Sequence, residues 1–379
     1  MRIAALGDAH LGRSAFSAVT PDGINQREHD FEESFLAAVE SCLATQPDLI
    51  VWLGDVFDHP RPSYRSFRIA MRALAKIRDA GARLVAISGN HDTPRLPGTG
   101  NPYAVLADAF PLFHFAYRME YEPVIVGDSV IHCVPQTRTA EDAVAALEQA
   151  SDARQTDRIN VLITHPLVQS VERRYPDINE IEIDDAQLRS DHVLLGHYHV
   201  FTKVRPSVFY AGSTDTFSFG DVADLPKGIV LLDTGSGNCT LHGLSGQRQL
   251  HTPDPVYAFG LSAGEVEERI ITALAPVPAG SVVRITLDGV TPEAHRLVDL
   301  RRVNEAASHL LHYRLEPSFD RGVAATESVP ELLSLVHRWK AFADVQLMDK
   351  PVDERDAIVE AGHRYLEEAI ETAVELSAD

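Results

Sequence analysis

Hydrophobic residues in the first half of the chain form short unbroken runs, and longer stretches of helical periodicity alternate with them. The runs cover residues 3–6, 49–53, 84–87, 161–163 and 192–195. Such runs are typical of strands that are buried on both faces. Helical spacing covers residues 28–44, 64–80 and 140–150. The alternation predicts a layered α/β domain.

Further strands are predicted over residues 208–210, 228–232 and 239–241, so the second part of this domain is richer in strands than the first. We expect residues 1–250 to form a two-sheet β-sandwich core flanked by helices. Two prolines close together at Pro253 and Pro255 predict a linker.

A smaller α+β cap is expected over residues 251–322, with helices at 262–274 and 292–308 and strands at 282–287 and 310–315. A C-terminal helical arm is expected over residues 323–379. One of its helices begins at the capping box Ser328–Glu331 and runs to Phe342, and the second carries an apolar stripe from Ile358 to Leu376.

Metal-binding side chains follow five of the predicted strands. Ligands at the carboxyl ends of parallel strands converge on one crevice, and buried charged or imidazole groups are costly unless a cation binds them. Two divalent cations about 3.5–4 Å apart can clamp the attacking and leaving oxygens of a phosphoryl transfer. The expected ligands are Asp8, His10, Asp55, Asn90, His165, His197 and His199.

Asp55 is the natural bridge between the two ions, because it follows what should be the central strand. Oxygen and nitrogen ligands without thiolate suit Mn²⁺, and also Fe or Zn. His91 adjoins the ligand Asn90, so its ring is free to donate a proton to a leaving alkoxide. We expect Asp58, three residues after the bridge, to orient His91 as a catalytic partner.

Three other histidines, His59, His132 and His192, lack this pattern and are expected at the surface or in the core. Arg65, Arg68, Arg72 and Lys76 share one face of a predicted helix. They form either a phosphate-contacting stripe or, as we favour, a solvated outer face.

The formal net charge of −21 weighs against a free-standing DNA-binding protein, although cations at the predicted site would invert the local field. The three cysteines are odd in number and widely spaced, as is typical of free cytosolic thiols. No apolar run is long enough for a membrane span, and no signal peptide is evident, so we expect a cytoplasmic protein.

Taken together, the motifs Asp8-x-His10, Gly54-Asp55-x-x-Asp58, Gly89-Asn90-His91-Asp92, His165 and Gly196-His197-x-His199 resemble those of the calcineurin-like metallophosphoesterases. The resemblance covers about the first 215 residues. Within that superfamily the chain is similar to the SbcD-type nuclease subunits of the SbcCD double-strand-break-repair complex. The finer similarity lies in residues 8–13, 54–58, 61–63 and 210–213.

By position, the family pattern implies one ion held by Asp8, His10, Asp55 and His199. It implies a second ion held by Asp55, Asn90, His165 and His197, with His91 as the catalytic histidine. It also implies Mn²⁺ dependence, 3′→5′ exonuclease and endonuclease activity on DNA, an SbcC-type coiled-coil ATPase partner that the C-terminal helices contact, and a homodimer.

The same residues could instead hydrolyse small phosphodiesters or phosphoproteins, and the motifs do not exclude this alternative. A non-catalytic scaffold is disfavoured because none of the expected ligands is lost. The cap and the helical arm favour the nuclease.

Overall fold

The protein is described from a computed structural model that covers residues 1–96, 99–171, 180–221, 226–319, 339 and 358–362. Contacts between residues divide the chain into two compact units. The first unit comprises Met1–Asp254, Glu268–Ile285 and Asp299–Glu316, and the second comprises Pro255–Glu267, Thr286–Val298 and Pro317–Asp379. The domain limits near 250 and 322 stay predictions.

The first sheet has six strands in the order β14-β13-β1-β2-β3-β4. Strands β1, β2, β3 and β4 run parallel to one another, and β13 and β14 are added antiparallel at one edge. Their bounds are β1 Arg2–Leu6, β2 Leu49–Trp52, β3 Leu84–Ile87, β4 His114–Ala116, β13 Gly228–Asp233 and β14 Asn238–Gly243.

The second sheet also has six strands, in the order β11-β12-β10-β7-β6-β5. Its four inner strands are parallel, and β5 and β11 are antiparallel edges. Their bounds are β5 Glu122–Val126, β6 Ser129–Val134, β7 Ile159–Thr164, β10 His192–Leu195, β11 Thr202–Arg205 and β12 Val208–Tyr210. A small parallel pair, β8 Leu167–Val168 and β9 Glu182–Ile183, lies apart from it.

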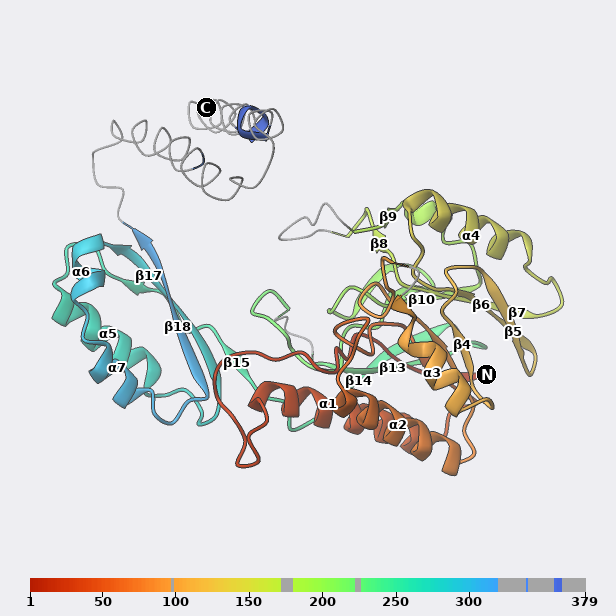
Figure 1. Cartoon of the computed structure of the whole chain (residues 1–379), viewed down its shortest axis with the longest axis horizontal. Helices are drawn as coiled ribbons and strands as arrows, with labels where there is room; N and C mark the ends of the chain where they lie inside the picture. The colour runs from red at the N-terminus through yellow and green to blue at the C-terminus, as the bar shows by residue number, and fades with distance from the viewer. Residues whose placement is uncertain (97–98, 172–179, 222–225, 320–338, 340–357, 363–379) are drawn as a thin grey trace. The chain divides into compact units, whose positions relative to one another are not determined.

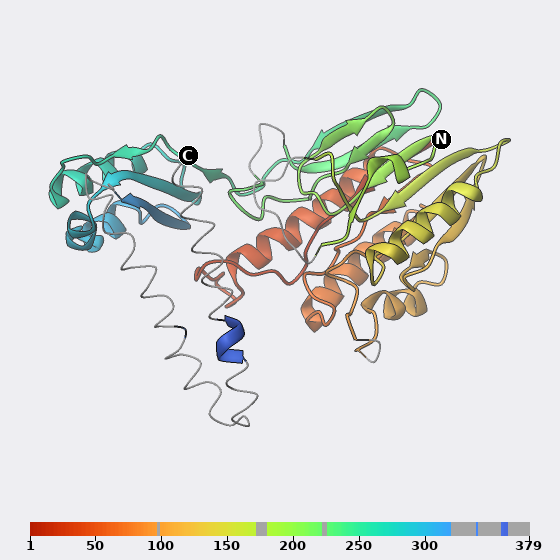
Figure 2. The same cartoon turned by 90° about the horizontal axis from the view of Figure 1, so that it is seen from above.

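The core of this unit is layered as helices, sheet, sheet and helix (Figures 1 and 2). In β1 the side chains of Ile3 and Ala5 pack between the two sheets, while Ala4 and Leu6 pack against the helices. This alternation follows from the two-residue period of a strand. Both faces of β1 are therefore buried, which explains its continuous apolar sequence.

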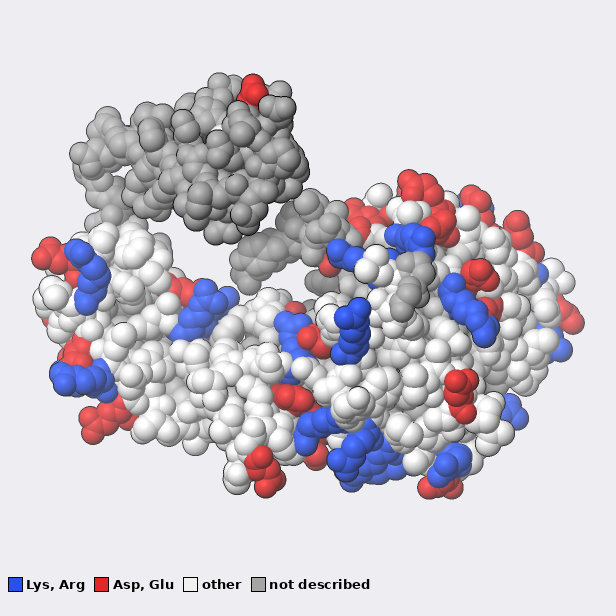
Figure 3. Space-filling view, in the orientation of Figure 1, with Lys and Arg blue, Asp and Glu red and all other residues white. Residues whose placement is uncertain are grey.

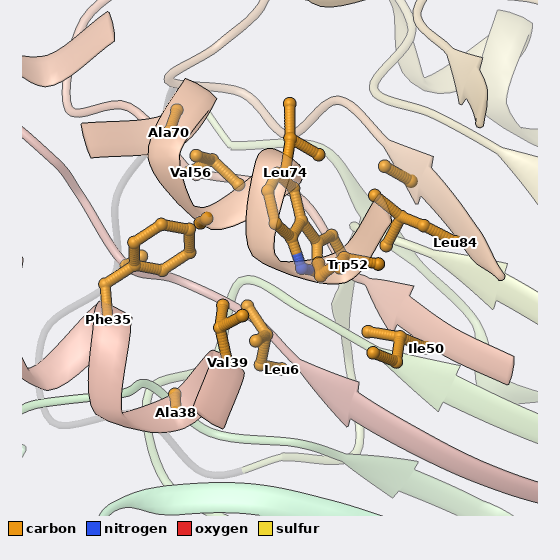
Figure 4. Packing of buried hydrophobic residues seen from close by; sticks show 14 of the residues in the cluster. Leu6, Phe35, Ala38, Val39, Ile50, Trp52, Val56, Ala70, Leu74 and Leu84 are labelled. Carbon is orange, nitrogen blue, oxygen red and sulfur yellow. The ribbon is translucent and has the colours of Figure 1, made fainter. Parts of the chain in front are cut away.

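Helices α1 Gln26–Ala44, α2 Tyr64–Asp79 and α3 Pro102–Ala109 contribute to the cluster on the outer face of the first sheet. Trp52 of β2 lies there beside Phe35 of α1 and Leu74 of α2, and all three side chains are fully buried (Figure 4). Helix α4 Ala140–Asp152 packs on the outer face of the second sheet through Ala143, Ala146 and Leu147. The two-sheet α/β fold expected from the sequence is confirmed.

A third sheet has the order β15-β17-β16, with β18 also paired to β17. Its strands are β15 Leu250–His251, β16 Val256–Tyr257, β17 Val282–Val290 and β18 His312–Phe319, and the helices nearby in sequence are α5 Ala263–Leu274, α6 Pro292–Leu297 and α7 Leu300–Ala306. The single helix predicted over 292–308 was wrong. Val298 adopts an extended ψ of 128°, and the Asp299 side chain caps a new helix by accepting from the Arg301 amide.

Most of the predicted C-terminal arm, including the helix from Ser328 and the stripe beyond Gly362, lies outside the described residues. Residues 358–362 are helical, and the Trp339 indole donates to the Val359 carbonyl at 3.2 Å. Within the part of the chain that the structure describes, no helix combines the length and the apolarity that a bilayer span requires.

Candidate metal centre

The expected ligands follow the carboxyl ends of strands β1, β2, β3, β7 and β10. Asp8, His10, Asp55 and His197 all adopt positive φ angles, between 47° and 83°. Residues other than glycine rarely adopt this left-handed backbone conformation. Backbone strain of this kind concentrates at functional sites. The sharp turns after the strands let residues two apart, such as Asp8 and His10, both face the crevice.

The ligand-type side chains form compact groups. Within each group the candidate atoms lie within 4.8 Å of one another: Asp8 with His10 and His199, Asp55 with His165 and His197, and His10 with Asp55 and His91. Asn90 joins the second group, since its Oδ1 is 3.2 Å from His165 Nε2 and 3.0 Å from His197 Nδ1. The structure thus brings together all seven residues that the sequence suggested as ligands.

The chemistry of this donor set fits a divalent cation. His10 Nδ1 lies 3.1 Å from the carboxylate of Asp58, and His199 Nδ1 lies 3.3 Å from the carboxylate of Asp221. Both rings therefore carry their proton on Nδ1, and their Nε2 atoms face each other at 3.2 Å. Two facing lone pairs repel unless a cation or a proton lies between them. Burial lowers the pKa of His10, which disfavours the extra proton.

His165 is held in the same manner. Its Nδ1 donates to the Leu53 carbonyl at 2.6 Å, and its Nε2 points at the Asp55 carboxylate, 3.2 Å away. Burial alone would lower the pKa of His165, but the charges of Asp55 and Asp8 raise it to about 9. Burial likewise opposes ionisation of Asp55, yet His165 and His10 hold its pKa well below the usual range. The same carboxylates would attract a cation, which would replace the extra proton on His165.

The Asp58 carboxylate contacts a different residue from the one expected. It lies 3.1 Å from His10 Nδ1 and 3.5 Å from Arg13 Nη1, but 3.9 Å from His91 Nδ1. The ring of His91 is instead held by the backbone carbonyl of Asp58, at 2.9 Å. The expected side-chain pairing of Asp58 with His91 is therefore replaced by a pairing with His10.

His91 has the geometry of a proton donor. Its backbone amide donates to Asp55 Oδ1 at 2.8 Å, which places the residue at the edge of the centre. Because a carbonyl only accepts, His91 Nδ1 is the protonated nitrogen and Nε2 is left for other partners. The side chain is 39% exposed, so a substrate can reach it.

Asp92, the last residue of the Gly-Asn-His-Asp motif, has a structural task that the sequence did not indicate. Its buried carboxylate accepts from the Phe57 amide at 2.9 Å and from the Gly89 amide at 3.0 Å. These bonds tie together the turns that follow β2 and β3. Burial and the charge of Asp55 raise the pKa of Asp92 to about 7.

A cavity of about 350 Å³ adjoins the centre, and Asn90, His165 and His197 form part of its wall. Arg95, from the turn after β3, and Arg138, from the turn after β6, also line it. The volume lies in the usual range for a small-molecule site. Both arginine side chains belong to exposed residues, and no ion pair of either is found among the described residues.

Two of the four residues of the basic stripe on α2 form ion pairs with α1. Arg65 donates to Glu32 at 2.6 Å through Nε, and Lys76 contacts Glu40. Arg68 and Arg72 are exposed and form no ion pair with any other described residue. Basic side chains gather over this region in Figure 3. The choice between a phosphate-contacting stripe and a solvated outer face stays a prediction.

Among the described residues, the three histidines without motif support belong to none of the ligand groups. His132 is buried between Tyr121, at 2.8 Å, and Asn160, at 3.1 Å. His192 is also buried, and its Nε2 contacts the Thr234 carbonyl at 3.0 Å. His59 is exposed, and it accepts from the Arg61 amide.

Comparisons with known proteins place these features in context. Residues 1–201 match the family of calcineurin-like phosphoesterases. The DNA double-strand break repair protein Mre11 of Methanococcus maripaludis is 28% identical over 239 residues, which cover 60% of this chain and 60% of the relative. The chain therefore matches less than two thirds of that relative's length.

A second Mre11 protein, from Halobacterium salinarum, is 27% identical over 323 residues, which cover 80% of this chain and 77% of that protein. Among solved structures, a dimetal phosphatase from Danio rerio covers 61% of this chain and 91% of its own, with a TM-score of 0.35 and 8% identity.

Proposed function

Because this chain belongs to the calcineurin-like phosphoesterase family, we propose that it is a metal-dependent nuclease that cleaves DNA phosphodiesters in double-strand-break repair. Its ions are two divalent cations, with Mn²⁺ as the physiological choice. Both 3′→5′ exonuclease and endonuclease activity are part of the proposal, as is an SbcC-type ATPase partner.

One observation carries the proposal. The seven ligand-type side chains meet at one edge of the two sheets. The relatives of this chain are named DNA double-strand break repair proteins. Four of the side chains, Asp8, His10, Asp55 and His165, are at most 2% exposed. Burying so many charged and imidazole groups without a bound cation would be costly.

The bound ions would supply Lewis-acid charge that activates water and neutralises the phosphate during in-line displacement. Asp55 lies between the two groups and would contact both ions. Asp8 would bind the ion held by His10 and His199, and Asn90 would bind the ion held by His165 and His197. The Asp58 carbonyl accepts the Nδ1 proton of His91, so the proton that the cationic ring can give up to a substrate is the one on Nε2. That proton is donated to the 3′-oxygen as it leaves.

The net charge of −21 is compatible with a DNA substrate if attraction is local. Two divalent cations would add four positive charges at the centre, and Arg95 and Arg138 line the adjoining cavity. Phosphate contacts fix the register of a nucleic acid. The remaining acidic surface would then limit binding to this region, and binding would weaken as salt is raised.

The other parts of the chain have roles in the same proposal. The cap, residues 251–322, positions DNA over the centre, and the C-terminal arm binds the coiled coil of the ATPase. A homodimer completes the assembly. Size-exclusion chromatography with light scattering, with and without the partner, measures each association.

The decisive experiment is cleavage of end-labelled linear duplex DNA by the purified chain, with Mn²⁺ and after chelation. We expect Mn²⁺-dependent cleavage that His91→Ala lowers by about 10²–10⁴-fold, the usual contribution of a general acid. His59→Ala is the matched control, because His59 is exposed and its ring accepts a hydrogen bond from the Arg61 amide. The control should retain full activity.

A small phosphodiester, bis(p-nitrophenyl) phosphate, is assayed in parallel. Efficient hydrolysis of this compound together with intact DNA would refute the nuclease and favour the alternative of a phosphodiesterase for small substrates. Hydrolysis of neither substrate with Mn²⁺ bound would leave the chain without its proposed catalytic activity.

A further inference from the structure

The segment that follows β12, residues 213–221, lies against the metal centre although it contributes none of the expected ligands. Its last residue, Asp221, faces His199, the ligand that completes the group of Asp8 and His10. We propose that Asp221 is a positioning residue, which fixes the tautomer and direction of the His199 ring so that Nε2 faces the ion. The inference rests on the proposed metal-dependent function.

The two nitrogens of the His199 ring face different residues. Its Nδ1 lies 3.3 Å from Asp221 Oδ2, and its Nε2 lies 3.2 Å from His10 Nε2. Since a carboxylate accepts and does not donate, the Nδ1 atom must carry the proton. The lone pair is thereby assigned to Nε2, the atom inside the centre. A ligand histidine is commonly oriented in this way by a carboxylate on its other nitrogen.

The Asp221 carboxylate is itself fixed. The same Oδ2 accepts from the backbone amides of Phe217 and Ser218, both at 3.1 Å. Asp221 therefore presents a fixed oxygen to His199 Nδ1.

The rest of the segment restrains the same ligand. The Phe217 ring lies edge-on to the ring of His10, with centroids 4.9 Å apart, and tilted against His199 at 5.2 Å. The carbonyl of His199 accepts from the Ser213 amide at 3.1 Å and also from the buried ammonium of Lys227. Backbone and ring of His199 are thus both held, by different residues, and Asp221 is the one that selects the tautomer.

The segment is anchored to α1 through a buried ion pair. Asp215 accepts from Arg27 at 3.2 Å and from Ser34. Arg27 also donates to the Thr216 carbonyl at 2.7 Å. These bonds give residues 215–217 a rigid support, and a rigid support is what a positioning carboxylate requires.

The test measures Mn²⁺ binding by the full chain, with calorimetry and with the electron paramagnetic resonance signal of free Mn²⁺. Asp221→Ala should weaken one of the two sites by about 10–100-fold, as is usual when such a partner of a metal ligand is removed. Asp221→Asn keeps an oxygen that can accept from Nδ1, so it should lose less affinity. Glu148→Ala, an exposed acid on α4, controls for the change in net charge.

A double-mutant cycle separates positioning from a general loosening of the turn. If Asp221 acts through His199, then Asp221→Ala should cause no further loss of Mn²⁺ affinity in a His199→Ala background. Equal losses in both backgrounds, or unchanged Mn²⁺ affinity of Asp221→Ala, would overturn the inference. A wild-type chain that binds two ions but leaves DNA intact would refute the nuclease alone, because the binding measurement stands without catalysis.

Discussion

Replacement of Asp58 by alanine tests the pairing between this carboxylate and His10. The substitution removes the oxygen 3.1 Å from His10 Nδ1 but keeps the backbone carbonyl that holds His91 at 2.9 Å. Two mechanisms therefore predict different outcomes. A partner of His10 affects metal binding, whereas a partner of His91 affects the rate of the chemical step at saturating metal.

The size of the effect follows from the surroundings of Asp58. Loss of a group that orients a metal ligand costs about 10–100-fold in affinity, or about 1.4–2.7 kcal/mol. The Asp58 side chain is 30% exposed, so water can partly replace its oxygen beside His10. We therefore expect a loss near the lower end, about tenfold.

The assay combines Mn²⁺ titration calorimetry with initial cleavage rates over a range of Mn²⁺ concentrations. Asp58→Ala should need about tenfold more Mn²⁺ for half-maximal rate and should then approach the wild-type rate. Asp58→Asn is the milder variant, because its amide oxygen can still accept from His10. Unchanged Mn²⁺ affinity with a rate that stays low at saturation would refute the pairing with His10 and restore the one with His91.

Three further predictions concern other parts of the first unit. Since the pKa of His165 is raised to about 9, metal-free His165 is protonated at pH 7.5. Mn²⁺ binding should then release about one proton, and affinity should rise about tenfold per pH unit up to about pH 9, as calorimetry in buffers of different ionisation enthalpy can measure. Gly196→Ala places its Cβ 2.2 Å from the Leu53 carbonyl oxygen and 2.5 Å from His165 Nδ1, so both thermal stability and Mn²⁺ binding should fall. Arg27→Ala leaves Asp215 buried without its cation and should lower the free energy of unfolding in urea by about 3–5 kcal/mol.

The prediction for Arg27→Ala can also be checked through the pH dependence of the free energy of unfolding. Burial already raises the pKa of Asp215 with Arg27 present, and loss of Arg27 raises it further. An acid whose pKa is raised by folding destabilises the protein as pH increases, so the deficit of Arg27→Ala should be larger at pH 8 than at pH 5. An equal deficit at both pH values would contradict the reasoning.

The Gly196→Ala prediction has a matched control in the chain. Gly264→Ala lies in α5 with no heavy atom within 4 Å of the added Cβ. It should raise stability by up to about 1 kcal/mol through helix propensity. Destabilisation by both glycine variants would show that the close contact at Gly196 is not the cause. Absence of proton release at pH 7.5 would mean that His165 is neutral before the metal binds.

The layered fold and the meeting of the ligands were predictable from the sequence because they depend on strand direction. Parallel strands joined by helices end at one edge, so residues that follow β1, β2 and β3 must lie near one another. The helices expected to begin at residues 64 and 140 correspond to α2 and α4, and the structure shows Ser63 and Thr139 accepting from the first helix amides. The break at Val298 was not predicted. An apolar residue at this position fits the helical pattern of residues 292–308 whether or not its backbone is helical.

The partners of the ligands were not predictable. Asp58 is close in sequence to Asp55, and only the path of the turn shows that its carboxylate reaches His10 while its carbonyl reaches His91. Asp221 follows His199 by 22 residues, in a segment without periodicity. Asp92 stands in a motif whose pattern does not distinguish a ligand from a residue that ties two turns together.

The sequence by itself determined which chemical groups the centre contains and the order in which strands deliver them, since both follow from residue type and strand polarity. Only the tertiary structure determined which atom of each group faces the interior of the centre. That choice depends on hydrogen bonds between segments far apart in the chain, such as those of His199 with Asp221 and of His165 with Leu53. The bond from His165 to the Leu53 carbonyl, for example, joins the second sheet to the first and requires that the two are packed together.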